Sequence, residues 1–294
     1  MNITLIVVLV YLTTQASMFS IKEVAETSTI VWPEPSFHGL IPIPRVANSD
    51  IFYWWFPSRN DRAKDPLILW LTGGPGCSAE LALFVENGPY KLSKDAKTIL
   101  KNEYSWNTNA NLLYVDQPLG VGYSERKKVK EEVGLDTSEN QVREDMFYFL
   151  QEFVKLYPEF KGRDFYITGE SFAGHYIPQV GNYMFKNQKD IDLQLKGLAI
   201  GNGFVNPSVQ YKGYADFAYR HDLIGILQLE DYTKAFDHCQ RMMKDQIPGG
   251  YLICYSLADR LASNDLGEPL FNQYDVTKAS LGKLGYDFSN ISHF

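Results

Sequence analysis

Apolar and polar positions along the chain follow two different periods. Short runs rich in apolar, β-branched and aromatic residues predict buried strands at 51–56, 67–71, 111–115, 165–168 and 195–200. A charged turn at 60–65 separates the first two runs, which predicts that these two strands form a hairpin. The later strands alternate with helical segments. The predicted fold class is therefore α/β, with a mostly parallel sheet and helices on both of its faces.

A long amphipathic helix is predicted between 138 and 157, with shorter helices at 79–86 and 172–184. Ser138 and Gln141 have the spacing of a capping box, and Pro158 ends the periodic run. We expect the apolar stripe of the long helix to pack on the sheet rather than to bind a ligand. Its members are Val142, Met146, Phe149, Leu150, Phe153, Val154 and Tyr157.

The two ends of the chain differ in pattern from its centre. A ten-residue apolar block at 3–12 is followed by small residues, and it is too short to span a bilayer. It predicts a signal peptide over 1–16 and a secreted, vacuolar or lysosomal location. Beyond residue 204 the spacing becomes that of amphipathic helices. We expect an α/β core over 17–204 and a helical region over 205–294.

Composition limits the partners of this chain. Of its 294 residues, 45% are hydrophobic, which is enough for a large core. The net charge of −7 and the pI of about 5.3 provide no basic face for phosphate groups, so nucleic acid is not an expected partner. No later stretch approaches the length of a membrane helix, and no membrane association is expected after removal of the signal peptide.

A serine with the setting of a nucleophile follows the strand at 165–168. That strand ends at Gly169, Ser171 comes two positions later, and the small residues Ala173 and Gly174 open a helix. A serine on such a strand–turn–helix is exposed above the carboxyl edge of the sheet, and the next backbone N–H points to the same place. The alternative is a serine in an ordinary loop between a strand and a helix.

A glycine-rich turn follows the strand at 67–71. The sequence there is Thr72-Gly73-Gly74-Pro75-Gly76, where backbone amides can approach a ligand without obstruction by Cβ atoms. Turns of this kind supply the second oxyanion donor in serine hydrolases. A phosphate-binding loop is the rival interpretation, but its Gly-Lys-Ser/Thr spacing is absent.

Together with three other stretches, these motifs resemble the serine carboxypeptidases, a family of the α/β-hydrolase fold. The motifs lie at 70–78, 86–90, 106–124, 169–176 and 200–203. The resemblance runs from about residue 37 to about residue 278. It implies release of C-terminal residues from peptides through an acyl-enzyme, without a cofactor or a metal. It also implies that the region after 205 is a helical insertion over the active site, and that the family's last strands are missing from this chain.

The resemblance assigns a role to seven residues. Ser171 would be the nucleophile, and the backbone N–H groups of Gly74 and Phe172 would hold the oxyanion. The substrate's terminal carboxylate would bind to Thr72, Gly73, Glu86 and Glu170. A glutamate that faces a carboxylate must carry a proton in order to donate a hydrogen bond, so we expect peptide binding to be strongest in acid.

Two of the carboxylate-binding residues have an alternative interpretation, and a third departs from the family pattern. Without the resemblance, Glu170 would be interpreted as a support of the turn and Glu86 as a surface charge at the end of a helix. Thr72 stands where the family usually has Asn, which predicts weaker or rearranged recognition of the carboxylate. Asp116 and Gln117 are expected to be structural, because they lie where a strand passes into a loop.

The remaining members of a catalytic triad are not identified. The family order is Ser, Asp, His, and its Gly-Asp-x-Asp and Gly-x-Gly-His signatures do not follow Ser171. His175 is interpreted as a buried, hydrogen-bonded residue, and His221 and His238 as parts of the insertion. Asp287 and His293 have triad order, but no strand is predicted to place them, so neither is assigned a role.

Three cysteines, Cys77, Cys239 and Cys254, leave one without a partner within the chain. We expect a bridge between Cys239 and Cys254. The resemblance places Cys77 where the family has a bond to a much later cysteine.

Three functional hypotheses remain open. The first is a serine-type exopeptidase acting on peptide or protein C-termini, poorly active as this chain alone because the base and its Asp are lacking. The second is a non-catalytic secreted relative. The third is an acyltransferase related to the same family. The oligomeric state is not predicted.

Overall fold

The computed structural model describes residues 34–46, 48–93, 98–126, 136, 138–263, 270–272 and 274–278. The predicted signal peptide, Asp287 and His293 lie outside these ranges. The chain forms two compact units, Met1–Val205 and Asn206–Phe294. Each unit is described separately below.

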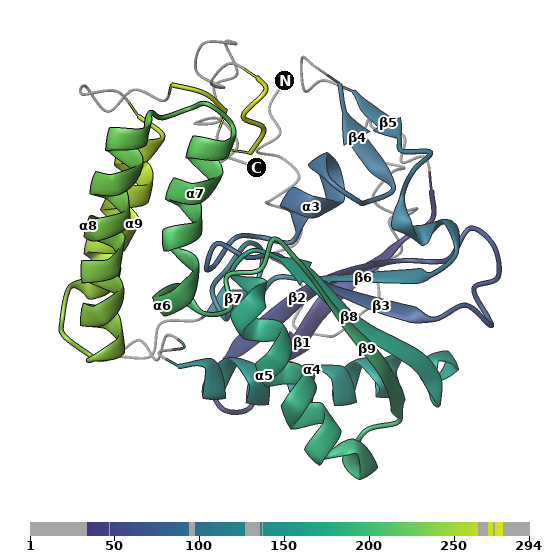
Figure 1. Ribbon diagram of the computed structural model, residues 1–294. Coiled ribbons are helices and arrows are strands. Elements are labelled where there is room, and N and C mark those ends of the chain that lie inside the picture. Colours follow the sequence, from purple (N-terminus) through teal and green to yellow (C-terminus); the bar gives the residue numbers. More distant parts are fainter. Residues whose placement is uncertain are drawn as a thin grey trace. The chain divides into compact units, whose positions relative to one another are not determined.

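The first unit is built on a seven-stranded sheet with the order β1-β2-β6-β3-β8-β9, in which β7 pairs with β2 (Figure 1). Its strands are β1 (Phe37–Pro42), β2 (Ser49–Phe56), β3 (Leu67–Leu71), β6 (Asn111–Val115), β7 (Glu125–Arg126), β8 (Arg163–Glu170) and β9 (Leu193–Gly201). The strands β6, β3, β8 and β9 run parallel, whereas β1 and β2 are antiparallel to their neighbours. The predicted α/β class is confirmed.

The predicted hairpin between the strands at 51–56 and 67–71 is wrong. β2 pairs instead with β1 and with β6, and β6 separates β2 from β3. The local hairpin is formed by β1 and β2. β3 is buried on both faces, and a strand of this kind belongs in the middle of a parallel sheet, where both of its edges are paired.

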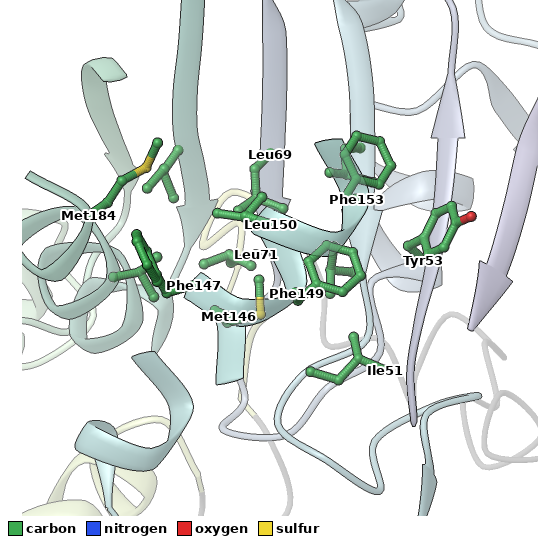
Figure 2. Packing of buried hydrophobic residues seen from close by; sticks show 14 of the residues in the cluster. Ile51, Tyr53, Leu69, Leu71, Met146, Phe147, Phe149, Leu150, Phe153 and Met184 are labelled. Carbon is green, nitrogen blue, oxygen red and sulfur yellow. The ribbon is translucent and has the colours of Figure 1, made fainter. Parts of the chain in front are cut away.

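One face of the sheet is covered by two helices, α4 (Glu139–Leu156) and α5 (Ala173–Lys186). Because successive side chains on a strand point to opposite faces, Leu69 and Leu71 of β3 face these helices. Figure 2 shows them beside Met146, Leu150 and Phe153 of α4. The predicted apolar stripe of α4 is buried, from Val142 to Tyr157, which confirms its place in the core.

The predicted capping box of α4 does not form. The helix begins after Ser138, but the Ser138 side chain makes no hydrogen bond to the first turn of the backbone. Its Oγ donates instead to Oε1 of Gln141 at 3.5 Å, so the two side chains that a box would aim at backbone N–H groups bond each other.

The opposite face of the sheet packs against α3 (Glu80–Val85). Trp54, Phe56, Trp70, Leu112 and Tyr114 form a second core cluster with the apolar side of this helix. The hairpin of β4 (Tyr90–Leu92) and β5 (Ile99–Lys101) follows α3 in sequence. One-turn 3-10 helices span Trp106–Thr108, Pro158–Phe160 and Gln188–Asp190.

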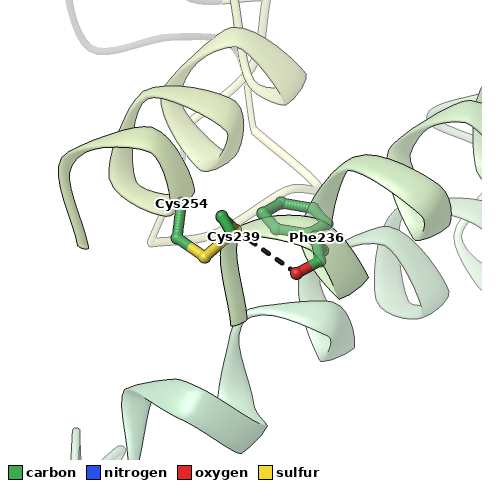
Figure 3. The surroundings of a disulfide bond; sticks show 3 residues. All are labelled: Phe236, Cys239 and Cys254. Carbon is green, nitrogen blue, oxygen red and sulfur yellow. Dashed lines mark hydrogen bonds between the residues drawn. A yellow bond between two sulfur atoms is a disulfide. The ribbon is translucent and has the colours of Figure 1, made fainter. Parts of the chain in front are cut away.

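The second unit is helical in its described part. It contains α6 (Pro207–Gln210), α7 (Lys212–Arg220), α8 (Ile226–Lys244) and α9 (Gly250–Leu261). A disulfide joins Cys239 of α8 to Cys254 of α9, as predicted (Figure 3). The Cys239 side chain also lies 3.3 Å from the carbonyl oxygen of Phe236. In the ranges that the structure describes, no helix is long and apolar enough to cross a bilayer.

Candidate active site

The register of the central strands places two loops side by side. β3 and β8 are parallel, and Leu71, the last residue of β3, pairs with Gly169 near the end of β8. The segment that starts at Thr72 therefore leaves the sheet next to the segment that contains Glu170 and Ser171. We call residues 72–79 the glycine turn and residues 169–174 the serine turn; the resemblance assigns one oxyanion donor to each of them.

Ser171 lies between the end of β8 and the start of α5, with a φ of 72°. This left-handed conformation is unfavourable for a serine by about 1–2 kcal/mol, and the surrounding backbone holds it. The Ser171 N–H donates to the carbonyl of Gly201 at 3.1 Å, and the Ser171 carbonyl accepts from Gly174 and Phe204 at 2.9 and 2.8 Å. Such strain, fixed by several hydrogen bonds, is typical of functional turns.

The glycine turn packs directly against the serine turn at Gly73. A Cβ atom added at Gly73 would lie 2.6 Å from the amide nitrogen of Phe172 and 2.7 Å from Cβ of Ser171. No side chain fits in that space, so the turns can approach this closely only with glycine at 73. Gly74, the next residue, has a φ of 111°.

The start of α5 favours negative charge beside Ser171. Phe172 is the N-cap of this 14-residue helix, and the first N–H groups of a helix have no partner within it. The helix dipole adds a partial positive charge at the same end. The predicted oxyanion donor at Phe172 therefore belongs to a helix end that is suited to hold an oxyanion.

Thr72 is only 2% exposed and has a partner that the sequence did not reveal. Nε1 of Trp70 donates a hydrogen bond to Oγ1 of Thr72 at 3.1 Å. The Thr72 hydroxyl keeps its own proton for donation, but its position is fixed by the indole. The spacing of two residues was the available signal, because in extended backbone the side chains at i and i+2 lie on the same face, and Thr72 directly follows β3.

The two glutamates assigned to the substrate carboxylate interact with each other. Glu86 ends α3, and Glu170 is the last residue of β8. Although Glu86 keeps contact with solvent, desolvation by the surrounding protein and then the charge of Glu170 raise its pKa to about 7. Burial also raises the pKa of Glu170. Desolvation is thus the largest cause of the raised pKa of Glu86, and the like charge of Glu170 comes second.

Cys77 lies on the glycine turn, where its N–H donates to the carbonyl of Gly73 at 3.2 Å. It is exposed and forms no disulfide in this structure. Partial desolvation of the thiol by the surrounding protein, and then the charge of Glu170, raise the pKa of Cys77, which places Cys77 and Glu170 in the same electrostatic neighbourhood.

His175 is partly buried one turn into α5. Its ring stacks on Phe172 at 4.7 Å between centroids and lies 5.9 Å from that of Phe204, and burial lowers its pKa. These ring contacts indicate that His175 has a structural role. His221 and His238 belong to the second unit, where His221 packs on Phe217 and His238 is exposed on α8.

Asp116 was expected to be structural, but its contact with Glu80 was not predicted from the sequence. Asp116 is fully buried and accepts backbone hydrogen bonds from Ala79 and Tyr123, each at 2.8 Å. Its structural role is thereby clear. Glu80, the first residue of α3, hydrogen bonds to Asp116 through its side chain. The only signal in the sequence was an acidic residue on a helix that packs on the sheet.

Comparison with known proteins identifies the family. The model of the serine carboxypeptidase family matches residues 29–285 of the chain. The chain belongs to the serine carboxypeptidase family. Serine carboxypeptidase-like 47 of Arabidopsis thaliana is 39% identical over 268 residues, which are 88% of this chain and 52% of that protein. Serine carboxypeptidase S10 family member 1 of Dictyostelium discoideum is 40% identical, covering 88% of this chain and 62% of that protein.

A solved member of the family has the same fold. Kex1Δp, a prohormone-processing carboxypeptidase from Saccharomyces cerevisiae, superimposes with a TM-score of 0.73 at 28% identity. The match covers 90% of this chain and 62% of that one. The sheet and its helices are therefore those of the α/β-hydrolase fold. The chain spans about half to three fifths of the length of these relatives.

No metal centre accompanies the site in the part of the chain that the structure describes. Among those residues, no group of three or more His, Cys, Asp or Glu side chains could hold a metal ion.

Proposed function

We propose that the serine turn and the glycine turn form the acylation centre of a serine-type carboxypeptidase, which removes residues from peptide C-termini. One observation carries the proposal. Ser171 is held at a positive φ between β8 and α5, with the backbone of Gly73 packed against it. An α/β-hydrolase nucleophile has this strand–turn–helix setting, and the family membership agrees with it.

The chemistry follows from the groups at the two turns. The Ser171 Oγ would attack the carbonyl carbon of the last peptide bond, and the amides of Gly74 and Phe172 would stabilise the oxyanion. Each such donor contributes about 10²- to 10³-fold to the rate. The proton of Ser171 must pass to a base, and no residue of this chain is assigned that role. Turnover by the chain alone is therefore expected to be weak.

Recognition of the C-terminus is proposed for Glu86 and Glu170, with Thr72 and Gly73. A carboxylate ligand requires donors, and a glutamate donates only when it is protonated. The raised pKa of Glu86, about 7, supports this role because it keeps the proton on the side chain in mildly acidic solution.

Labelling with a fluorophosphonate, followed by peptide mapping, tests the acylation centre. We expect slow labelling that is confined to Ser171 and lost in Ser171→Ala, because the oxyanion donors act without a base. The exposed Ser138→Ala is the matched control and should label as the wild type does. Labelling spread over several serines, or unchanged in Ser171→Ala, would contradict the proposal.

A secretory location is proposed together with this function. The predicted signal peptide and the disulfide between Cys239 and Cys254 support it, because disulfides persist in oxidising compartments.

A further inference from the structure

The acid pair behind the glycine turn joins two loops of the first unit. Asp116 directly follows β6 and is fully buried. Its Oδ1 accepts from the amide of Ala79, at the end of the glycine turn, at 2.8 Å. Its Oδ2 accepts from the amide of Tyr123, in the loop after β6, also at 2.8 Å. One side chain therefore fixes both loops.

The fit around Asp116 is close. Gly122 has a φ of 54°, and a Cβ atom added there would lie 2.0 Å from Oδ2 of Asp116. Ser124 donates from its Oγ to the Asp116 carbonyl at 2.6 Å and accepts from the amide of Phe52, which ties the same loop to β2.

Glu80, the first residue of α3, also contacts Asp116. Its carboxyl group hydrogen bonds to that of Asp116, and the Ser78 hydroxyl donates to Oε2 of Glu80. Two ionised carboxylates can only accept hydrogen bonds, so the contact between Glu80 and Asp116 requires a proton on one of them.

The hydrogen bonds from backbone amides indicate which of the two carboxyl groups holds the proton. Two N–H groups donate to Asp116 and favour its ionised form, so the proton resides on Glu80. Burial, followed by the charge of Asp116, raises the pKa of Glu80 to about 8. Burial raises the pKa of Asp116 as well, against the lowering effect of its two backbone donors.

We propose that Glu80 and Asp116 share one proton and act as an acid-dependent clamp that holds the glycine turn against the loop at 116–124. Loss of the proton places two negative charges in contact and weakens the hydrogen bonds that fix Ala79 and Tyr123. The clamp is thus closed in acid and loosened as the pH rises.

The titratable neighbour of the pair is the phenol of Tyr123. Burial, and then the charges of Glu80 and Asp116, raise its pKa, so it stays neutral throughout the range in which the clamp works. Ser78 faces Glu80 from the glycine turn and does not titrate there. Loosening of the clamp is therefore governed by the proton that Glu80 and Asp116 share.

The effect of the clamp on the active site rests on the proposed function, whereas the proton shared by Glu80 and Asp116 does not depend on it. Gly74 lies on the same turn as Ser78 and Ala79, five residues before the end that Asp116 holds. In a working enzyme, an open clamp would leave the Gly74 amide less well placed for the oxyanion. Glu80 and Asp116 would then be positioning residues that restrict activity to acid conditions.

Urea unfolding of the full chain at pH 5 and pH 8 tests the clamp through Glu80→Gln. The amide of Gln keeps a donor for Asp116 at every pH, so it imitates the protonated acid. The folded state of the wild type binds a proton more tightly than the unfolded state between the ordinary pKa of 4.5 and the raised value of about 8. Wild-type stability should therefore fall over this range.

We measure the ratio of the folding constant of Glu80→Gln to that of the wild type. This ratio should increase at least about tenfold from pH 5 to pH 8. The control is Glu103→Gln, whose side chain is 70% exposed, and its ratio should stay constant. A constant ratio for Glu80→Gln would overturn the proposal.

Hydrogen exchange of the wild type gives a second readout that needs no variant. After correction for intrinsic exchange rates, protection of the Ala79 and Tyr123 amides should fall several-fold between pH 5 and pH 8, while that of β3 amides changes less. Equal changes in all three would overturn the clamp. Neither readout depends on catalysis. Failure of fluorophosphonate labelling at Ser171 would instead contradict the proposed function and leave the clamp standing.

Discussion

At the scale of single residues, the surrounding protein sets the backbone conformation of Ser171 and the pKa values of nearby glutamates. Ser171 adopts a φ of 72° because three backbone hydrogen bonds hold its turn, and Gly73 permits the close approach of the neighbouring turn. Glu86 and Glu80 have their pKa values raised mainly by burial.

Replacement of Glu86 by Gln should remove a pH dependence from peptide binding. The pKa of Glu86 is about 7, so the wild type loses its donor to a peptide carboxylate as the pH rises from 5.5 to 8.5. We expect its affinity for an N-acyl dipeptide with a free C-terminus to fall about tenfold over that interval. Glu86→Gln keeps a donor and should change by less than threefold. Fluorescence anisotropy measures both, and equal pH profiles would contradict the role of Glu86.

The serine turn could be predicted from sequence because its requirements are local. A strand, a glycine, a serine and small residues must follow in order, and they do so within 165–174. The contact of Glu80 with Asp116 could not be derived in the same way. It depends on β6 pairing with β3, which brings residues 36 positions apart into contact.

At the scale of elements, buried strands were easier to predict than their partners. The runs at 67–71 and 111–115 coincide with β3 and β6, because a strand buried on both faces is a continuous apolar run. The hairpin predicted between the runs at 51–56 and 67–71 was wrong, because it was inferred from nearness in sequence. The capping box failed for a similar reason: the spacing of Ser138 and Gln141 permits a bond between their side chains as well as bonds to the backbone.

A matched pair of glycine variants tests how the loop after β6 is held. Gly120 and Gly122 both have positive φ values, 89° and 54°, but only the added Cβ at 122 meets Asp116, whereas nothing lies within 4 Å at 120. Both Ala variants share a backbone cost of about 1 kcal/mol. We expect Gly122→Ala to lose about 1–3 kcal/mol more than Gly120→Ala in urea unfolding. Equal losses would show that the loop does not pack on Asp116.

At the scale of the whole molecule, the chain consists of an α/β unit that carries the proposed acylation centre and a helical unit with a disulfide. The composition predicted a folded protein, and the ordered motifs predicted the family, which is confirmed. The relation of the second unit to Ser171 could not be predicted from periodicity, because helical spacing determines which face is apolar and not where that face packs.

Removal of the disulfide should affect the second unit alone. Cys239 and Cys254 are 15 residues apart, and closing a loop of that size contributes about 3 kcal/mol. In the double variant Cys239→Ser with Cys254→Ser, hydrogen exchange followed by mass spectrometry should show lower protection in α8 and α9. Peptides from β3 and β8 serve as the internal control. An equal loss in those strands would contradict a local effect of the disulfide.

The most direct test of the account compares the affinities of one N-acyl dipeptide and its C-terminal amide for the wild-type chain at pH 5. The two ligands differ only in the group that Glu86 and Glu170 are proposed to bind. The account predicts that the free acid binds at least about tenfold more tightly, since a charge-assisted hydrogen bond contributes about 1.5–3 kcal/mol. Equal affinities, or tighter binding of the amide, would contradict a site for peptide C-termini beside Ser171.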